Sequence, residues 1–243
     1  MDSARYLESL ADDAALLIAA GRHDGATAVP TCPGWDLDAL LWHVAVVYRH
    51  KVVCIRIGRP PDPWPPPRPS GAVADELRAA YDELTEQLRV RDPADPAFTW
   101  YPPDQTVGFW QRRMAQETAV HRVDAQLAVG VATPIAADIA ADGVDEFLTM
   151  MLAPDYTDTP ADAPDRTLRI KAGGREWLVT VTPRRVSASR NPAAAEPADA
   201  TITGDPSTVD LWLWGRGGDT DLDVEGDPAA IEALHAAIGR GAQ

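Results

Sequence analysis

The sequence predicts an antiparallel bundle of four main helices followed by a small α+β domain. Up to about residue 152, apolar residues recur at three- and four-residue steps, the periodicity of helices that bury one face. Beyond residue 166 they come instead in short runs between glycine and aspartate turns, which is typical of strands. We therefore expect a helical domain at 1–152 and an α+β domain at 167–243, joined by a Pro-, Asp-, Ala- and Thr-rich linker at 153–166.

The first two predicted helices are separated by a tight turn. The first helix has one apolar face, made by Leu7, Leu10, Ala14 and Leu17. The turn is the segment TCPGWD at residues 31–36, in which Asp36 fits the N-cap position of the second helix. Residues 37–57 are strongly apolar and Gly58 supplies the stop, so the sequence predicts a long second helix.

Proline and apolar spacing divide the rest of the helical domain. Residues 59–69 hold seven prolines, so they cannot be helical and we expect an extended connector. A third helix follows, with one apolar face at Leu77, Tyr81, Leu84 and Leu88. After a loop at 91–106 we expect a fourth helix at 107–129, ended by Gly130, and a fifth at 138–152.

The second domain mixes strands and helices. The runs TLRIKA and REWLVTV flank Gly173-Gly174, which is a strong hairpin pattern. A loop near 191–200 leads to a short strand within 198–205 and a helix at 206–216. A further strand within 220–227 and a closing helix at 228–240 complete the expected domain.

Charge and composition disfavour several classes of protein. The chain has 22 basic and 37 acidic residues and a formal net charge of -15, which disfavours nucleic-acid and anionic-lipid binding. No apolar run approaches the roughly 20 residues that cross a bilayer, and the N-terminal segment carries acids where a signal peptide carries bases. Two cysteines suit a reducing compartment. We expect a cytoplasmic monomer or homodimer that contacts neither nucleic acid nor membrane.

Three side chains on two predicted helices suggest a metal site. Glu117 and His121 are four residues apart, so they lie one turn apart on the same face of the fourth helix, which is largely apolar. His43 lies on an apolar face of the second helix. A buried carboxylate needs a partner, a proton or a metal. Two imidazoles and one carboxylate match a catalytic zinc site with an open position, and nickel or iron would accept the same ligands.

Other interpretations of these residues stay open from the spacing alone. A Glu-x-x-x-His pair usually lies on a solvated helix face or makes a local hydrogen bond. His50 shares the face of His43 and is the rival ligand, but its place near the end of the helix predicts a surface residue. His23, in a loop, and His235, on the last helix, are expected to be structural or exposed.

Asp124 and Cys32 also allow two interpretations each. Asp124 either accepts a hydrogen bond from a ligand imidazole and fixes its tautomer, or forms a salt bridge with Arg122 or Arg113. Cys32 stands just before the second helix, where the helix N-terminus would favour a reactive thiolate. The alternative, which we favour, is a small residue that fills the turn under Trp35.

Three motifs resemble those of a known family. VPTCPGWDLDALLWHVA at residues 29–45 and ETAVHRVDAQLAVG at 117–130 resemble the two metal-site motifs of the mycothiol-dependent maleylpyruvate isomerase family, a branch of the DinB-like metal-binding bundles. ATITGDPSTVDLWLWGR with VEGDPAAIEAL resembles its small sterol-carrier-like C-terminal domain. The resemblance implies a DinB-like up-and-down bundle, a zinc ion on His43, Glu117 and His121, and mycothiol as cosubstrate.

The resemblance also implies a role for one arginine. In the isomerase an arginine of the C-terminal domain assists catalysis, and Arg216 is its best match here. Arg216 would hold a substrate carboxylate, or alternatively satisfy carbonyl groups at the end of a helix. The connector at 59–69 and the loop at 91–106 are expected to border the mouth of the site and to be particular to this sequence, so the resemblance does not identify the substrate.

These observations lead to one principal function and two alternatives. We expect a metal-dependent enzyme that joins mycothiol to a small electrophilic substrate, either as a cis–trans isomerase or as a thiol S-transferase. One alternative is a non-catalytic zinc-containing binding or regulatory (anti-sigma-like) module. The other is a metal-dependent hydrolase with Glu117 or Asp124 as the base.

Overall fold

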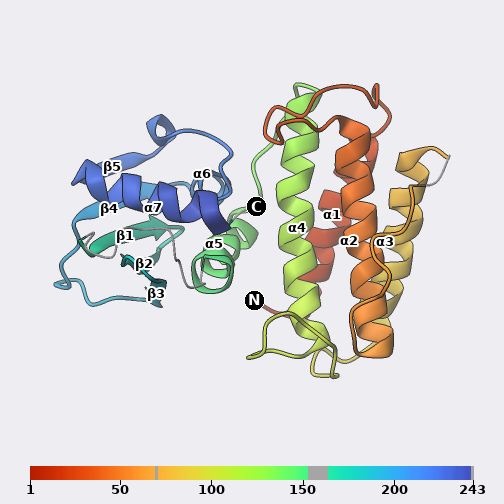
Figure 1. The fold of residues 1–243 in the computed structure, drawn as a ribbon, viewed down its shortest axis with the longest axis horizontal. Helices are drawn as coiled ribbons and strands as arrows, with labels where there is room; N and C mark the ends of the chain where they lie inside the picture. The colour runs from red at the N-terminus through yellow and green to blue at the C-terminus, as the bar shows by residue number, and fades with distance from the viewer. Residues whose placement is uncertain (69–70, 153–163, 242–243) are drawn as a thin grey trace. The chain divides into compact units, whose positions relative to one another are not determined.

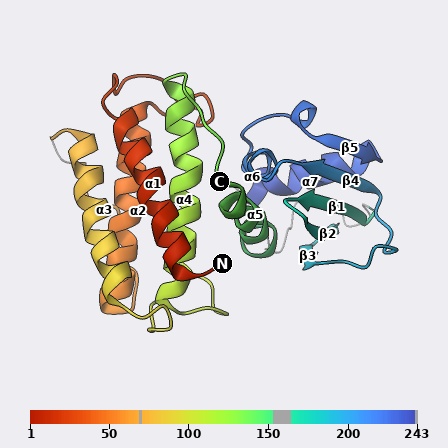
Figure 2. The same ribbon diagram turned by 180° about the vertical axis from the view of Figure 1, so that it is seen from behind.

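The computed structural model describes residues 1–68, 71–152 and 164–241. It divides the chain into two compact units, Met1–Ile135 and Ala136–Gln243. The first is helical and the second combines a sheet with helices, as the sequence predicts (Figures 1 and 2). No helix in the described part of the chain has the length and apolarity that crossing a membrane requires.

The first unit is a bundle of four helices, α1 (Ser3–Ala20), α2 (Leu37–Ile57), α3 (Val73–Val90) and α4 (Val107–Ala128). Asp36 caps α2 by accepting a hydrogen bond from the backbone N–H of Ala39, at 2.8 Å. Gly58 ends α2 with φ 67°, and Gly130 follows α4 with φ 78°, a conformation that favours glycine. The predicted start and stop residues of both long helices are therefore confirmed.

The helices α2 and α3 run parallel, although the sequence predicted an antiparallel bundle. Two ion pairs between the helices show their relative direction. Arg49 pairs with Glu76 at 2.8 Å. Further along both helices, Arg56 pairs with Glu86 at 3.7 Å. The segments before α2 and before α4 each join two antiparallel helices, whereas the connector after α2 leads back to the end of the bundle where α2 began (Figure 1).

The proline-rich connector explains this parallel pair. Its Trp64 ring lies 5.3 Å from the His50 ring, near the last turns of α2, and its Arg68 pairs at 2.8 Å with Asp38, in the first turn of α2. Because proline keeps this segment extended, about ten residues are enough to return along the length of a 21-residue helix. The chain therefore starts α3 at the end of the bundle where α2 started.

The second unit is built on a five-stranded sheet with the order β3-β2-β1-β4-β5. The strands are β1 (Arg166–Ala172), β2 (Arg175–Val181), β3 (Val186–Arg190), β4 (Ala200–Gly204) and β5 (Asp223–Gly226). Among the four strand pairs described in this sheet, β1–β4 is parallel and the others are antiparallel. The helices are α5 (Ala137–Glu146), continued by a π-helical turn at Phe147–Met151, α6 (Pro206–Leu213) and α7 (Pro228–Gly241), with a 3₁₀ turn at Asp219–Asp221.

The predicted hairpin of β1 and β2 is confirmed, but the sequence did not predict strand β3. Gly173 and Gly174, with φ 56° and 74°, form the β1–β2 turn. The segment that forms β3 was not expected to be a strand. Its only fully buried side chain is Val186, because β3 lies at the edge of the sheet and the rest of it is polar. A strand of this kind has little of the apolar alternation that identifies strands in a sequence.

The helix at 137–151 belongs to the sheet unit and not to the bundle, so the boundary expected at residue 152 is displaced to 135. Asp145 on α5 accepts a hydrogen bond at 3.0 Å from the Trp177 indole on β2 and pairs with Arg190 on β3. Phe147 and Leu148 are buried in the same apolar core as the sheet. Of the linker expected at 153–166, residues 153–163 lie outside the described residues and Arg166 already belongs to β1.

Candidate metal centre

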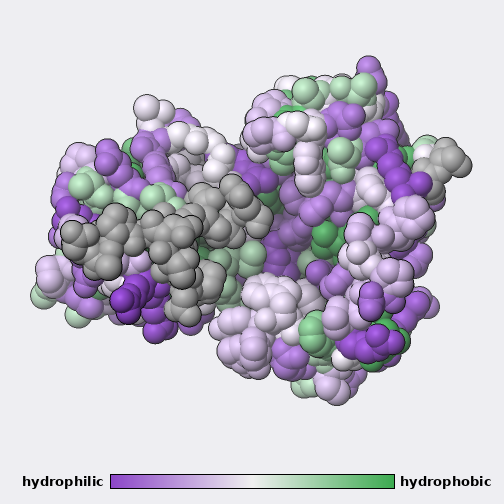
Figure 3. Space-filling view, in the orientation of Figure 1, coloured by the Kyte–Doolittle hydropathy of each residue, from purple (hydrophilic) through white to green (hydrophobic). Residues whose placement is uncertain are grey.

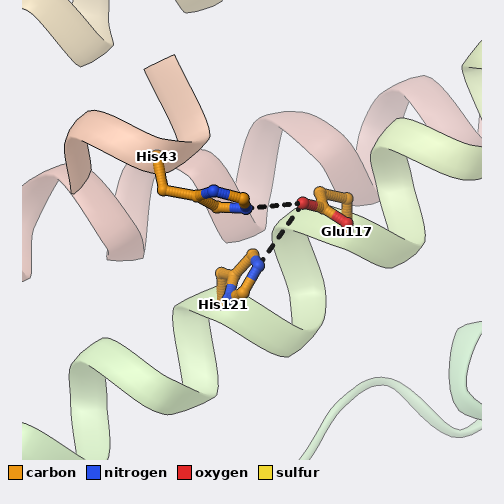
Figure 4. A group of neighbouring side chains, drawn as sticks. All are labelled: His43, Glu117 and His121. Atoms are coloured by element: carbon orange, nitrogen blue, oxygen red, sulfur yellow. Dashed lines mark ion pairs between the residues drawn. The ribbon is translucent and has the colours of Figure 1, made fainter. Parts of the chain in front are cut away.

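The three predicted ligands meet between α2 and α4. The Nε2 atoms of His43 and His121 lie 3.4 and 3.3 Å from the same oxygen of Glu117, Oε1, and the two imidazole rings are 5.1 Å apart (Figure 4). One potential ligand atom from each residue falls within 4.8 Å of the others. Within the described ranges, no other group of His, Cys, Asp and Glu side chains has this arrangement.

This donor set fits a divalent metal with an open position. Two imidazole nitrogens and one carboxylate oxygen are the ligand types of catalytic zinc sites, whereas structural sites are closed by four ligands. The side chains of His121 and Glu117 are 12% and 15% exposed, but that of His43 is 37% exposed, so the site opens toward solvent on the α2 side. Figure 3 shows a hollow over α4 and α2, with hydrophilic side chains in it.

Charges around Glu117 keep it ionised. Burial alone would raise the pKa of Glu117, but His121, the hydrogen bond from His43 and the charge of Arg113 outweigh burial and hold that pKa well below its usual range. Arg113, one turn earlier on α4, donates to the second carboxylate oxygen of Glu117 at 2.5 Å. One oxygen of Glu117 thus faces the imidazoles and the other is held by a guanidinium. The sequence suggested Arg113 only as a partner of Asp124.

His121 is protonated more readily than an ordinary histidine when no metal is bound. Burial would lower its pKa, but the carboxylates of Glu117 and Asp124 raise it to about 9. A metal must displace this proton before Nε2 can bind it. Metal binding and protonation of His121 therefore compete.

We expect zinc affinity to rise about tenfold per pH unit between pH 6.5 and about 9, because one proton is displaced over that range. For the metal-free protein, the raised pKa contributes stability that is complete below pH 6.5 and is lost as the pH rises to about 9. Competition with a chromogenic chelator and thermal unfolding measure the two effects. Zinc affinity that is the same at pH 6.5 and pH 8.5 would contradict the competition.

Asp124 contacts His121. Its buried carboxylate lies 2.9 Å from Nδ1 of His121, the nitrogen that does not face Glu117. Of the two arginines considered as partners, Arg113 binds Glu117, and Arg122 binds Asp13 at 2.9 Å. An acceptor at Nδ1 keeps the proton there and leaves Nε2 to a metal.

The turn before α2 supports this carboxylate from the other side. Thr31 donates a hydrogen bond to Asp124 Oδ1 at 2.5 Å, and the Cys32 sulfur lies 3.7 Å from Oδ2. The Trp35 ring lies 5.0 Å from the His43 ring. The TCPGWD segment therefore contacts both sides of the candidate site, and Cys32 is a partly buried, unbridged residue of this turn.

Replacement of Asp124 by asparagine is expected to weaken zinc binding about 10- to 100-fold with little change in fold, because the amide no longer stabilises the Nδ1–H tautomer with a charge. Asp38→Asn, which alters an exposed ion pair on the same bundle, is the matched control and should leave zinc affinity unchanged. Isothermal titration of both variants with zinc, in the presence of a competing chelator, measures the two zinc affinities. Equal affinities in the two variants would remove Asp124 from the site.

The remaining histidines do not join the ligand group. His50 is half-buried, not a surface residue as expected, because Trp64 from the connector packs on its ring. Burial and the neighbouring Lys51 lower its pKa to about 4. His23 is exposed, as expected, and His235 is exposed and lies 3.3 Å from Asp219. The proline spacing of the connector gave no sign of this packing.

Arg216 belongs to the second unit. Its guanidinium donates to the backbone carbonyl of Trp214, just after α6, which agrees with the interpretation that it satisfies a carbonyl at a helix end. The same side chain lines a cavity of about 420 Å³, together with Thr208, Leu211, Trp212, Gly217, Gly218 and Asp221. A carboxylate could enter beside it there, so both interpretations of Arg216 stay open.

Two family models match most of the chain. The mycothiol maleylpyruvate isomerase N-terminal domain matches residues 7–126, which include all three ligands, and the MDMPI C-terminal domain matches 138–233, which include Arg216. The second match begins close to the division observed after residue 135.

Solved structures agree with these matches. The chain is similar to a crystal structure of a histidine-to-alanine mutant of the mycothiol-dependent maleylpyruvate isomerase, with 13% identity and a TM-score of 0.62. It is also similar to a crystal structure of the mycothiol-dependent maleylpyruvate isomerase, with 14% identity and a TM-score of 0.58. Each similarity covers 93% of this chain and 95% of the other, and at these identities it shows the fold alone. No curated protein matches the sequence.

Proposed function

Because the chain belongs to the mycothiol-dependent maleylpyruvate isomerase family, we propose that it is a metal-dependent enzyme with mycothiol as cosubstrate. It acts as a cis–trans isomerase or as a thiol S-transferase on a small electrophile. The convergence of His43, Glu117 and His121 on one point, with His43 partly exposed, carries this proposal. Zinc is the metal that suits these ligands best, and nickel or iron would also bind.

The proposed reaction uses the sulfur of the cosubstrate as nucleophile. A metal held by His43, Glu117 and His121 would lower the pKa of a thiol bound at its open position, as metal ions do for coordinated thiols. As a cis–trans isomerase, the chain would let this sulfur add to a cis alkene conjugated with a carbonyl. The adduct would turn about the new single bond, and the thiol would then leave to give the trans isomer. In an S-transferase the sulfur stays on the product.

Other residues of the chain would orient the metal ligands and neutralise the charge of the substrate. Asp124 holds the proton of His121 on Nδ1, and Arg113 orients Glu117 so that Oε1 faces the imidazoles. We assign Arg216 the binding of a substrate carboxylate and stabilisation of developing enolate charge. Both cysteines are unbridged, which supports a place in the reducing cytoplasm.

The test is an assay of the zinc-loaded protein with mycothiol and either maleylpyruvate or a panel of electrophiles. We expect turnover that requires both thiol and metal, and free mycothiol that is consumed only if the activity is S-transfer. Omission of mycothiol and removal of the metal with a chelator are the controls. Turnover of esters or amides without thiol would favour the metal-dependent hydrolase, and full activity in verified metal-free protein would refute the proposal.

A further inference from the structure

Lys51 on α2 is mostly buried, about two helical turns after His43. Its ammonium nitrogen lies 4.8 Å from the centre of the Trp110 ring on α4 and 3.4 Å from Nδ1 of His50. It is one of only two lysines among the 22 basic residues of the chain. The other, Lys171, is 41% exposed and pairs with Glu176 at 3.8 Å.

The ammonium of Lys51 has no carboxylate beside it. Among residues 1–68, 71–152 and 164–241, no carboxylate oxygen lies within the 4.0 Å of an ion pair with Lys51. Burial of a charge without such a partner is costly. It lowers the pKa of Lys51, and the more distant charge of Glu117 offsets this only in part. The ammonium therefore rests on the Trp110 ring and the His50 nitrogen, and neither group is anionic.

His50 supplies no negative charge. Its Nδ1 faces two donors, the Lys51 ammonium and the Cys54 thiol, each at 3.4 Å. With a pKa of about 4 the ring is neutral near pH 7, and these donors place its proton on Nε2. Trp64 and Trp110, which pack on His50 and Lys51, have no charge either.

Lys51 lies at the same end of the candidate metal centre as Trp110, about two helical turns from the ligands. It follows His43 by eight residues on α2, and Trp110 precedes Glu117 by seven on the antiparallel α4, so both are about 10–12 Å along the bundle from the ligands. Side chains of a helix lean toward its N-terminus, which brings the ammonium back toward His43. The charges of Glu117 and Arg113 both act on Lys51.

We infer that Lys51 is the anion-binding group of a carboxylate subsite beside Trp110, next to the metal ligands. An ammonium offers three donors and a single charge, which one carboxylate would satisfy with a charge-assisted hydrogen bond. A lone cation with a neutral imidazole matches a carboxylate better than a phosphate dianion. That this carboxylate belongs to the substrate rests on the proposed function.

The subsite is tested by isothermal titration with maleate, a simple dicarboxylate, at low ionic strength. The full-length protein is used both as purified and after zinc loading. We expect Lys51→Met to weaken maleate binding about tenfold or more in both preparations, since one charge-assisted hydrogen bond is lost. Lys51→Arg should bind within about threefold of the wild type, and Lys171→Met is the matched control that should change nothing.

A second measurement on the wild-type protein does not depend on how the variants fold. Maleate should protect Lys51, but not Lys171, from acetylation by an amine-selective reagent, as read by mass spectrometry. Equal maleate affinity of wild type and Lys51→Met, or no protection of Lys51, would overturn the subsite. Binding of maleate through Lys51 without thiol-dependent turnover would keep the subsite and refute the proposed function. Thiol-dependent turnover with no effect of Lys51 on maleate binding would keep the proposed function and refute the subsite.

Discussion

Replacement of His121 by alanine is expected to abolish metal binding and thiol-dependent turnover. His121 supplies one of three ligands and connects Glu117 to Asp124, so its loss leaves two ligands and removes the partner of a buried carboxylate. We expect zinc affinity to fall by more than about 10- to 100-fold, which is the loss typical when a residue that hydrogen-bonds to a metal ligand is replaced. Metal analysis after dialysis against a weak chelator and the assay above measure both losses.

His23→Ala is the matched control for this variant. His23 lies in an exposed loop, so its removal should leave about one metal per chain and full turnover. Circular dichroism and the thermal unfolding of both variants separate loss of metal from loss of fold. If His121→Ala folds and still holds one metal per chain, His121 is not a ligand and the proposed site is wrong.

Replacement of Arg122 by alanine is expected to cost about 3–5 kcal/mol of stability, the usual effect of breaking a buried ion pair. Arg122 is 2% exposed and is bound through several hydrogen bonds. Its guanidinium donates to Asp13 at 2.9 Å, to Gln126 at 2.8 Å and to the carbonyl groups of Thr133 and Pro134 at 2.5 and 3.2 Å. Removing it leaves the Asp13 carboxylate buried without its cation.

Urea unfolding followed by far-ultraviolet circular dichroism measures this loss. Arg5→Ala is the control, because Arg5 forms an exposed ion pair with Glu8 and such pairs contribute about 0–1 kcal/mol. A loss below about 1 kcal/mol for Arg122→Ala would show that this network does not stabilise the bundle. The two variants thus compare the same substitution at a buried ion pair and at an exposed one.

Helical spacing predicted part of the candidate metal centre, and the family resemblance favoured His43 over His50, which lies on the same face of α2. Glu117 and His121 share a face of any helix that contains both, and the apolar neighbours of His43, Leu40 and Val44, are indeed fully buried. The choice between a salt bridge and a histidine contact for Asp124 could not be made from spacing. It depends on Arg122, whose side chain turns to Asp13 on α1, and on Thr31, which is 93 residues away in the chain.

The parts of the fold that were not predicted depend on long-range contacts. The parallel direction of α2 and α3 follows from the path of the connector. The connector returns to the start of α2, where Arg68 pairs with Asp38. The place of α5 in the sheet unit depends on hydrogen bonds from Trp177 and Arg190 to Asp145. A lysine near the last turns of a helix usually reaches solvent, whereas Lys51 lies against the Trp110 ring of α4, which its place in the sequence does not predict.

An anomalous-diffraction map of crystals grown from the zinc-loaded protein gives the most direct measurement of the metal centre. We expect one peak between α2 and α4, about 2.0–2.2 Å from Nε2 of His43, Oε1 of Glu117 and Nε2 of His121, with the fourth position filled by solvent or thiol. No peak at this place, or a fourth protein ligand that closes the site, would contradict the proposed catalytic centre.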